Sequence, residues 1–184
     1  DDKSSKYFDG TAIHWYESTY DFFPDALQYA HNKAPNKYLI EHLHPKYAPV
    51  NRYARDIIGC LNNWVDGWVD WNMVLDTQGG PNWFKNWCVA PVIVDIEKDE
   101  VYFTPLYYTL AHFSKYIRPQ AEIIEVKKSD KDLMVTAAKN PDNSMVVIVF
   151  NEGATQKNIE LELDGKFVEI SVSAQAIQSI VITN

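Results

Sequence analysis

The sequence predicts an α/β region followed by an antiparallel β-sandwich. Up to about residue 118, short apolar strands alternate with helical segments, and beyond Pro119 only short strands separated by turn signals follow. A strand–helix–strand succession requires parallel pairing with right-handed crossovers, whereas a meander of short alternating strands is typical of a sandwich. We therefore expect two domains, residues 1–118 and residues 119–184.

Three strands and three helices are expected in the first region. The strands lie at residues 11–16, 37–41 and 67–75, and the helices at residues 24–32, 50–64 and 105–117. Pro24 and Pro49 mark two helix starts, because proline is tolerated in the first turn of a helix. The second helix is amphipathic, with apolar residues close to the i, i+3, i+4, i+7 series: Val50, Tyr53, Ala54, Ile57, Ile58, Leu61 and Trp64.

Six short strands are expected in the second region. They lie near residues 123–126, 133–138, 145–150, 159–163, 167–172 and 177–182. Most alternate between apolar and polar residues, as a half-buried strand does. The turn signals are Asn140-Pro141-Asp142-Asn143 and Asp164-Gly165.

Composition excludes several classes of protein. The formal net charge of −8 argues against nucleic-acid binding, because phosphate contacts need a clustered basic surface. No apolar run approaches the roughly 20 residues of a membrane helix, and the polar residues 1–5 do not resemble a signal peptide. Cys60 and Cys88 have no metal or redox spacing, and their pairing is left open.

The first region is short for the fold that it suggests. A complete (β/α)8 barrel takes about 250 residues, and only about three β/α units precede the sandwich. Three parallel strands leave an open edge and a half-covered sheet. We therefore expect a partial (β/α)8 barrel of about three β/α units, incomplete in this chain.

The segment GWVDWN at residues 67–72, followed by GPNW at residues 80–83, is unusually rich in aromatic and polar side chains for a strand end. Tryptophan offers a flat apolar surface for the C–H faces of sugars, and Asp and Asn hydrogen-bond hydroxyl groups. This combination indicates carbohydrate recognition.

Five motifs resemble those of the glucosylceramidase-like glycoside hydrolases of family 30. In order, they are AIHWY at 12–16, GWVDWNMVL at 67–75, GGPNWFKN at 79–86, PVIVD at 91–95 and YYTLAHFSKYI at 107–117. The family fold is a (β/α)8 barrel with a side β-sandwich. This chain resembles its C-terminal part, which is about the last three β/α units and most of the sandwich. The resemblance implies retaining hydrolysis of β-glycosides by two carboxylates, without a cofactor.

The resemblance also locates the two carboxylates. The family's acid/base lies in an Asn-Glu-Pro motif, which this sequence lacks. Its nucleophile is the Glu of a Ser/Thr-Glu-Ala motif at the end of strand seven, where this chain has Glu41 followed directly by His42. Either Glu41 has taken the role, or a segment with the true nucleophile is absent after it; we favour the second.

The same resemblance assigns substrate contacts. Trp71 matches the sugar-stacking tryptophan, and Asn86 matches a polar loop residue near the first sugar. His14 and Tyr16 end the first strand and are expected to contact the substrate. Asp70 is expected to bond a sugar hydroxyl or to orient its neighbours. Trp68 is expected to pack in the barrel. No metal site is expected, since Glu41, His42 and His44 lack the usual helical spacing.

We therefore expect a β-glycosidase that acts on a β-glucoside, a glucosylceramide-like lipid or a β-1,6-glucan, with this chain forming the sugar-binding wall. Its expected partners are a carbohydrate or glycolipid substrate and the N-terminal half of the same enzyme. The resemblance implies a secreted or periplasmic protein. The alternative is a non-catalytic carbohydrate-binding module or an inactive remnant, because both catalytic motifs are absent.

Overall fold

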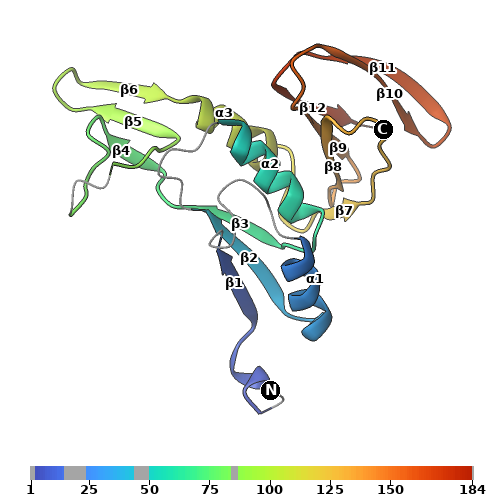
Figure 1. Ribbon diagram of the computed structural model, residues 1–184, viewed down its shortest axis with the longest axis horizontal. Coiled ribbons are helices and arrows are strands. Elements are labelled where there is room, and N and C mark those ends of the chain that lie inside the picture. The colour runs from blue at the N-terminus through green and yellow to red at the C-terminus, as the bar shows by residue number, and fades with distance from the viewer. Residues whose placement is uncertain (1–2, 15–23, 44–49, 84–86, 184) are drawn as a thin grey trace. The chain divides into compact units, whose positions relative to one another are not determined.

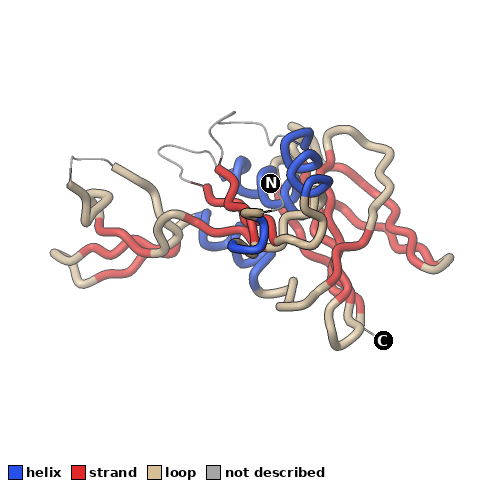
Figure 2. Tube along the Cα trace, turned by 90° about the horizontal axis from the view of Figure 1, so that it is seen from below, coloured by secondary structure: helices blue, strands red, loops and turns tan. Residues whose placement is uncertain are grey.

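The computed structural model describes residues 3–14, 24–43, 50–83 and 87–183. The chain divides into two compact units, Asp1–Tyr108 and Thr109–Asn184. The boundary between the units lies inside helix α3 (Pro105–Ser114). The sequence analysis puts the domain boundary after residue 118. Figure 1 follows the elements along the chain by colour, and Figure 2 marks helix, strand and loop. None of the helices in the described ranges is long and apolar enough to cross a membrane.

The first unit is built on a parallel sheet. After a short 3-10 turn at Ser5–Tyr7, strands β1 (Gly10–His14), β2 (Tyr38–Leu43) and β3 (Gly67–Asp70) pair in the order β1-β2-β3. Helix α1 (Pro24–Lys33) connects the first two strands, and helix α2 (Val50–Leu61) connects the last two. The predicted β/α units and their parallel pairing are therefore confirmed.

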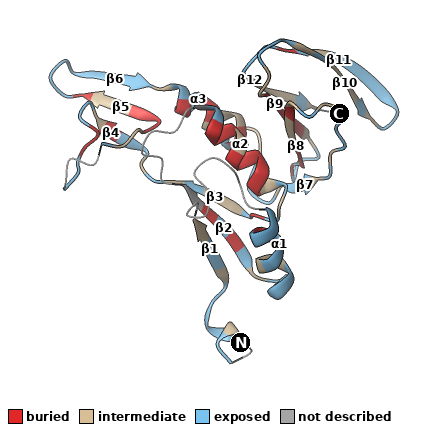
Figure 3. Ribbon diagram, in the orientation of Figure 1, coloured by how far each residue is buried: buried red, intermediate tan, exposed pale blue. Residues whose placement is uncertain are grey.

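The helices cover one face of this sheet. Leu39 of β2 is 2% exposed and packs in one cluster with Leu27 of α1 and Cys60 of α2; Figure 3 shows the buried residues of β2 and α2 in red. Successive strand residues point to opposite faces, so Tyr38 and Ile40 lie on the other face, where both are exposed. Among the described residues of this unit, only the helix side of the sheet is covered, whereas parallel sheets are normally buried on both faces.

Helix α2 ends earlier than the apolar pattern predicts. The predicted last residue, Trp64, lies beyond the helix with φ = 63°. The N–H of Val65 bonds to the carbonyl of Cys60 (3.2 Å), which is the six-to-one bond of a Schellman motif. The indole of Trp64 stacks on the His31 ring of α1, with centroids 4.8 Å apart. Trp64 therefore terminates α2 and contacts α1.

The predicted strand at residues 67–75 is wrong as a single element. The chain bends after Asp70, and strand β4 (Val74–Asp76) belongs to a second sheet with β5 (Val92–Asp95) and β6 (Glu100–Phe103), which the sequence analysis did not predict. The Asp70 side chain accepts the N–H of Trp71 (2.8 Å). This local bond takes the donor away from the strand ladder, as Asp side chains often do.

The second unit contains the six predicted strands. The four-stranded antiparallel sheet has the order β12-β9-β8-β7, with β7 at Glu122–Ile124, β8 at Leu133–Lys139, β9 at Met145–Asn151 and β12 at Ala176–Ile182. Strands β10 (Lys157–Leu163) and β11 (Lys166–Val172) form a separate hairpin. Asp164 and Gly165 both have positive φ (49° and 73°), as a two-residue hairpin turn requires. An antiparallel sandwich is therefore confirmed.

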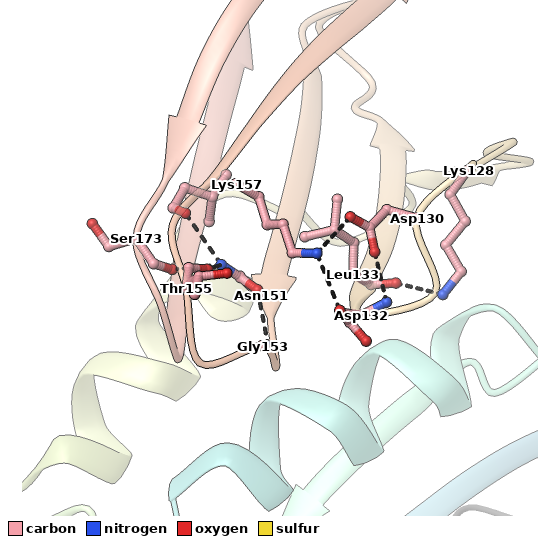
Figure 4. A network of polar contacts seen from close by, with 10 residues as sticks. Lys128, Asp130, Asp132, Leu133, Asn151, Gly153, Thr155, Lys157 and Ser173 are labelled. Atoms are coloured by element: carbon pink, nitrogen blue, oxygen red, sulfur yellow. Dashed lines mark hydrogen bonds and ion pairs between the residues drawn. The ribbon is translucent and has the colours of Figure 1, made fainter.

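Asn151 joins the ends of three strands in this unit (Figure 4). It is fully buried, and its Nδ2 donates to the carbonyls of Thr155, Val172 and Ser173 at 2.9, 3.2 and 3.0 Å. Its Oδ1 accepts the N–H of Gly153 at 2.9 Å. One amide side chain thus satisfies backbone groups just after β9, just before β10 and at the end of β11.

We predict that Asn151→Ala lowers the free energy of unfolding of the second unit by about 2–3 kcal/mol, because buried backbone groups lose their partners. The exposed Asn158, which accepts from Ser171 Oγ, supplies the matched control; Asn158→Ala should change stability by less than about 0.5 kcal/mol. Amide hydrogen exchange of residues 145–172 measures both. Equal losses in the two variants would contradict the assigned role.

Candidate functional site

The carboxyl ends of the parallel strands gather most of the predicted site residues that the structure describes. His14 ends β1 and pairs in register with His42, and Asp70 ends β3 opposite Leu43. Trp71 follows directly and is 49% exposed. In barrels, active groups lie at this end of the strands. Tyr16 and Asn86 fall outside the described residues.

The alternation of the strands divides these residues between the two faces of the sheet. Ile13, Glu41 and Trp68 occupy one register row, so they share a face. Trp68 contacts Tyr53 of α2, with ring centroids 5.4 Å apart, which identifies that face as the helix side. His14, one residue beyond Ile13, is therefore on the opposite, open face.

Two hydrogen bonds of opposite sense join α2 to β3. Tyr53 Oη of the helix donates to Asp70 Oδ1 of the strand at 2.9 Å. Trp68 Nε1 of the strand donates to Asp56 Oδ2 of the helix at 2.7 Å. Each element thus contributes one aromatic donor and one carboxylate acceptor. This reciprocal pair holds the end of β3 against the helix.

Asp70 bonds to the protein in a way that fits the orienting role considered for it. Its Oδ1 accepts both the Tyr53 hydroxyl and the N–H of Trp71. It is on the helix side of the sheet, since it is two residues beyond Trp68. A direct bond from Asp70 to a sugar stays a prediction, and the geometry gives it an anchoring role as well.

Glu41 occupies an apolar position between the sheet and the helices. Its side chain is 1% exposed, and within the described part of the chain neither carboxyl oxygen has a hydrogen-bond partner. Burial, and then the nearby Asp56 charge, raise the pKa of Glu41 to about 8. The side chain is therefore protonated at neutral pH. A nucleophile that attacks a sugar must be ionised and face the substrate, so this geometry does not favour that role.

The remaining groups around Glu41 are also buried. Burial raises the pKa of Asp56, and the bond from Trp68 and the charge of Arg52 partly offset it. The Cys60 thiol is 4.0 Å from Asp56, and burial holds its pKa far above the ordinary value. Cys60 is thus an unreactive core residue, and neither it nor Cys88 is part of a disulfide. Among the residues that the structure describes, no group of three His, Cys, Asp or Glu side chains is arranged to hold a metal ion.

Sequence reasoning missed Tyr53 and Asp56 as members of a polar cluster. Tyr53 counts as an apolar position in the helical pattern, and Asp56 was not singled out. A signal was present, because the two lie three residues apart on one helix face, and Trp68 and Asp70 lie two apart on a strand. The sequence does not show that these two faces meet.

The turn after β4 shapes an apolar pocket of about 330 Å³. Its lining includes Gly79, Trp87, Cys88, Ile93 and Leu106. Asp76 Oδ1 holds the turn by accepting the N–H groups of Gln78 and Gly80, each at 2.8 Å. A Cβ at Gly80 would lie 2.8 Å from the Asp76 carboxylate, which explains the glycine. The GGPN motif therefore forms a tight turn beside this pocket.

We predict that Glu41→Gln stabilises the protein at alkaline pH and leaves its stability at pH 4 nearly unchanged. The folded-state pKa of about 8 exceeds the ordinary 4.5, so folding binds a proton. The stabilisation is complete below about pH 4.5 and falls by about 1.4 kcal/mol per pH unit until pH 8. Glutamine has no proton to lose, so the variant should exceed the parent at pH 8 by about 4 kcal/mol.

Urea unfolding followed by tryptophan fluorescence checks this, because all six tryptophans lie in the first unit. The exposed Glu97 in the β5–β6 turn provides the control, and Glu97→Gln should leave the pH profile unchanged. If the free energies of unfolding of Glu41→Gln and the parent differ by the same amount at every pH, the assigned burial of Glu41 is contradicted.

Comparison with known proteins identifies both parts of the chain. The family model described as the glycosyl hydrolase family 30 TIM-barrel domain matches residues 1–117. The model described as the glycosyl hydrolase family 30 beta sandwich domain matches residues 120–180. The two matches follow each other in the order of the two regions predicted from sequence.

Curated relatives are similar to this chain in sequence over the aligned residues. Lysosomal acid glucosylceramidase of Mus musculus is 34% identical over 169 residues, 84% of this chain and 33% of the mouse protein. Putative glucosylceramidase 4 of Caenorhabditis elegans is 34% identical over 187 residues, 93% of this chain and 34% of the relative. Endo-1,6-beta-D-glucanase BGN16.3 of Trichoderma harzianum is 28% identical over 148 residues, 76% and 30% of the two chains. The chain thus spans about a third of the length of these relatives.

Solved structures agree on the fold. SrfJ from Salmonella typhimurium matches 100% of this chain and 43% of its own, with a TM-score of 0.91 and 25% identity. The endo-beta1,6-glucanase BT3312 matches 97% of this chain and 42% of its own, with a TM-score of 0.84 and 22% identity, which supports the fold alone. A partial barrel followed by a sandwich is confirmed, and the chain belongs to glycosyl hydrolase family 30.

Proposed function

We propose that the protein hydrolyses β-glycosidic bonds with retention of configuration, and that this chain forms the sugar-binding wall of the active site. The observation that carries the proposal is the match of both regions, in order, to the two domains of one glycoside hydrolase family. In such a reaction two carboxylates about 5–5.5 Å apart act as acid/base and nucleophile.

The proposed wall consists of groups at the carboxyl ends of the strands. Trp71 stacks on a sugar ring, and its 49% exposure leaves part of the indole available. His14 lies on the open sheet face and hydrogen-bonds hydroxyl groups. Tyr16 and Asn86 are assigned the same role by the family resemblance alone. The reciprocal bonds between α2 and β3 support this role, because a stacking residue needs a rigid base.

We place the acid/base in the full-length protein outside this chain, because the sequence contains no Asn-Glu-Pro. For the nucleophile, the buried and protonated Glu41 is a poor candidate. We therefore propose that it too lies in another segment of the full-length protein.

A β-glucosidic substrate is our preference, either a glucosylceramide-like lipid or a β-1,6-glucan. The names of the mouse and Trichoderma relatives refer to these two kinds of substrate. From the family resemblance alone, we propose a secreted or periplasmic location.

A non-catalytic carbohydrate-binding or inactive protein is the second candidate. The observation that favours it is Glu41, which is turned to the helix side in the place where the family carries its nucleophile. A binding module would bind sugar at Trp71 without turnover. An inactive protein would show neither sugar binding nor turnover.

Hydrolysis assays on the full-length protein separate the candidates. We expect turnover of an aryl β-glucoside, and NMR should show the β-anomer as the first product. An intact mass well above 21.2 kDa, with peptide mapping across Glu41–His42, would show that this chain is part of a larger enzyme, and the two carboxylates should then be sought in its other segments. A contiguous chain near 21.2 kDa that binds glucan without turnover would replace the enzyme by the binding module.

We predict that Trp71→Ala raises KM for the glucoside about tenfold, because an aromatic contact contributes roughly 1–1.5 kcal/mol. The exposed Tyr29 on α1 gives a control, and Tyr29→Ala should leave KM unchanged. Steady-state kinetics measures both. An unchanged KM for Trp71→Ala would remove Trp71 from the site.

A further inference from the structure

We propose that Tyr53, a buried residue of α2, positions Trp71 for sugar stacking through the Asp70 carboxylate. This inference rests on the proposed function, since it assigns a role within the same site. Tyr53 touches no substrate, because it is 0% exposed and lies on the helix side of the sheet. It is therefore a positioning residue.

One oxygen atom joins Tyr53 to the backbone of Trp71. Asp70 Oδ1 accepts the Tyr53 hydroxyl at 2.9 Å and the N–H of Trp71 at 2.8 Å. The second bond is formed at the residue where β3 ends and the chain bends away from the sheet. The direction of the chain at Trp71 is thus fixed by the Asp70 rotamer, and the Tyr53 hydroxyl holds that rotamer.

Burial gives this contact its strength. Tyr53 is enclosed, and its ring meets the ring of Trp68 at an interplanar angle of 60°. A buried hydroxyl needs a partner, and a bond to a carboxylate is among the stronger ones. Burial and then the Asp70 charge raise the pKa of Tyr53, so the hydroxyl keeps its proton and stays a donor.

Removing the hydroxyl leaves the rest of the contact between α2 and β3 in place. Trp68 Nε1 still donates to Asp56, and the Tyr53 ring still packs on Trp68 in a phenylalanine variant. Tyr53→Phe therefore removes one hydrogen bond of Asp70 Oδ1 without detaching the strand from the helix. A stacking ring acts only in a narrow range of positions, so a less firmly held Asp70 rotamer displaces Trp71 and weakens sugar binding.

The test is a double-mutant cycle in the full-length protein with the variants Tyr53→Phe, Trp71→Ala and their combination. We expect Tyr53→Phe to raise KM for an aryl β-glucoside about threefold to tenfold with kcat changed less than about twofold. In the Trp71→Ala background the same change should have no further effect on KM, because the ring that Tyr53 positions is gone. The exposed Tyr29 supplies the control, and Tyr29→Phe should leave KM unchanged.

Two results would overturn the inference in an active protein: an unchanged KM for Tyr53→Phe, or KM increases that multiply in the double variant. If Tyr53→Phe fails to fold, Asp70→Asn replaces it, since the amide weakens both bonds, and the same cycle with Trp71→Ala applies. A parent protein with neither turnover nor sugar binding would overturn the proposed function, and this inference with it.

Discussion

The reciprocal hydrogen bonds between α2 and β3 are the constraint on which the first unit depends. Tyr53 donates to Asp70, and Trp68 donates to Asp56, so the helix and the strand each hold one carboxylate that has an aromatic donor as partner. Charged groups in such a layer are costly without partners. The two bonds also fix the end of β3, and with it the place where the chain bends towards the second sheet.

Glu41 shows what the same layer costs a carboxyl group that has no hydrogen-bond partner among the described residues. It shares a face with Leu39 and a register row with Trp68, and burial keeps it protonated at neutral pH. The charge of Asp56 raises the pKa of Glu41 further, and burial raises the pKa of Cys60 as well. The carboxyl group at the expected position of the nucleophile therefore points into the core and carries a proton at neutral pH.

Much of this fold could be predicted because its signals are local. The 3.6-residue period marked α2, prolines marked helix starts, and the Asp164-Gly165 turn between alternating segments marked the β10–β11 hairpin. Two errors also had local causes that the period does not show. Trp64 continued the apolar pattern past the helix end, and the Asp70 side chain ended a strand that the apolar residues appeared to extend.

By itself, the sequence determined the order and type of most elements, the two regions, and the aromatic and polar residues at strand ends that indicate a sugar. Tertiary structure decided which face each of these residues occupies and with which residue it bonds. Glu41 and His14 lie at similar strand positions, yet register and helix cover bury the first and leave the second on the open face. The physical reason is that burial and partners depend on contacts between distant segments, such as Tyr53 with Asp70.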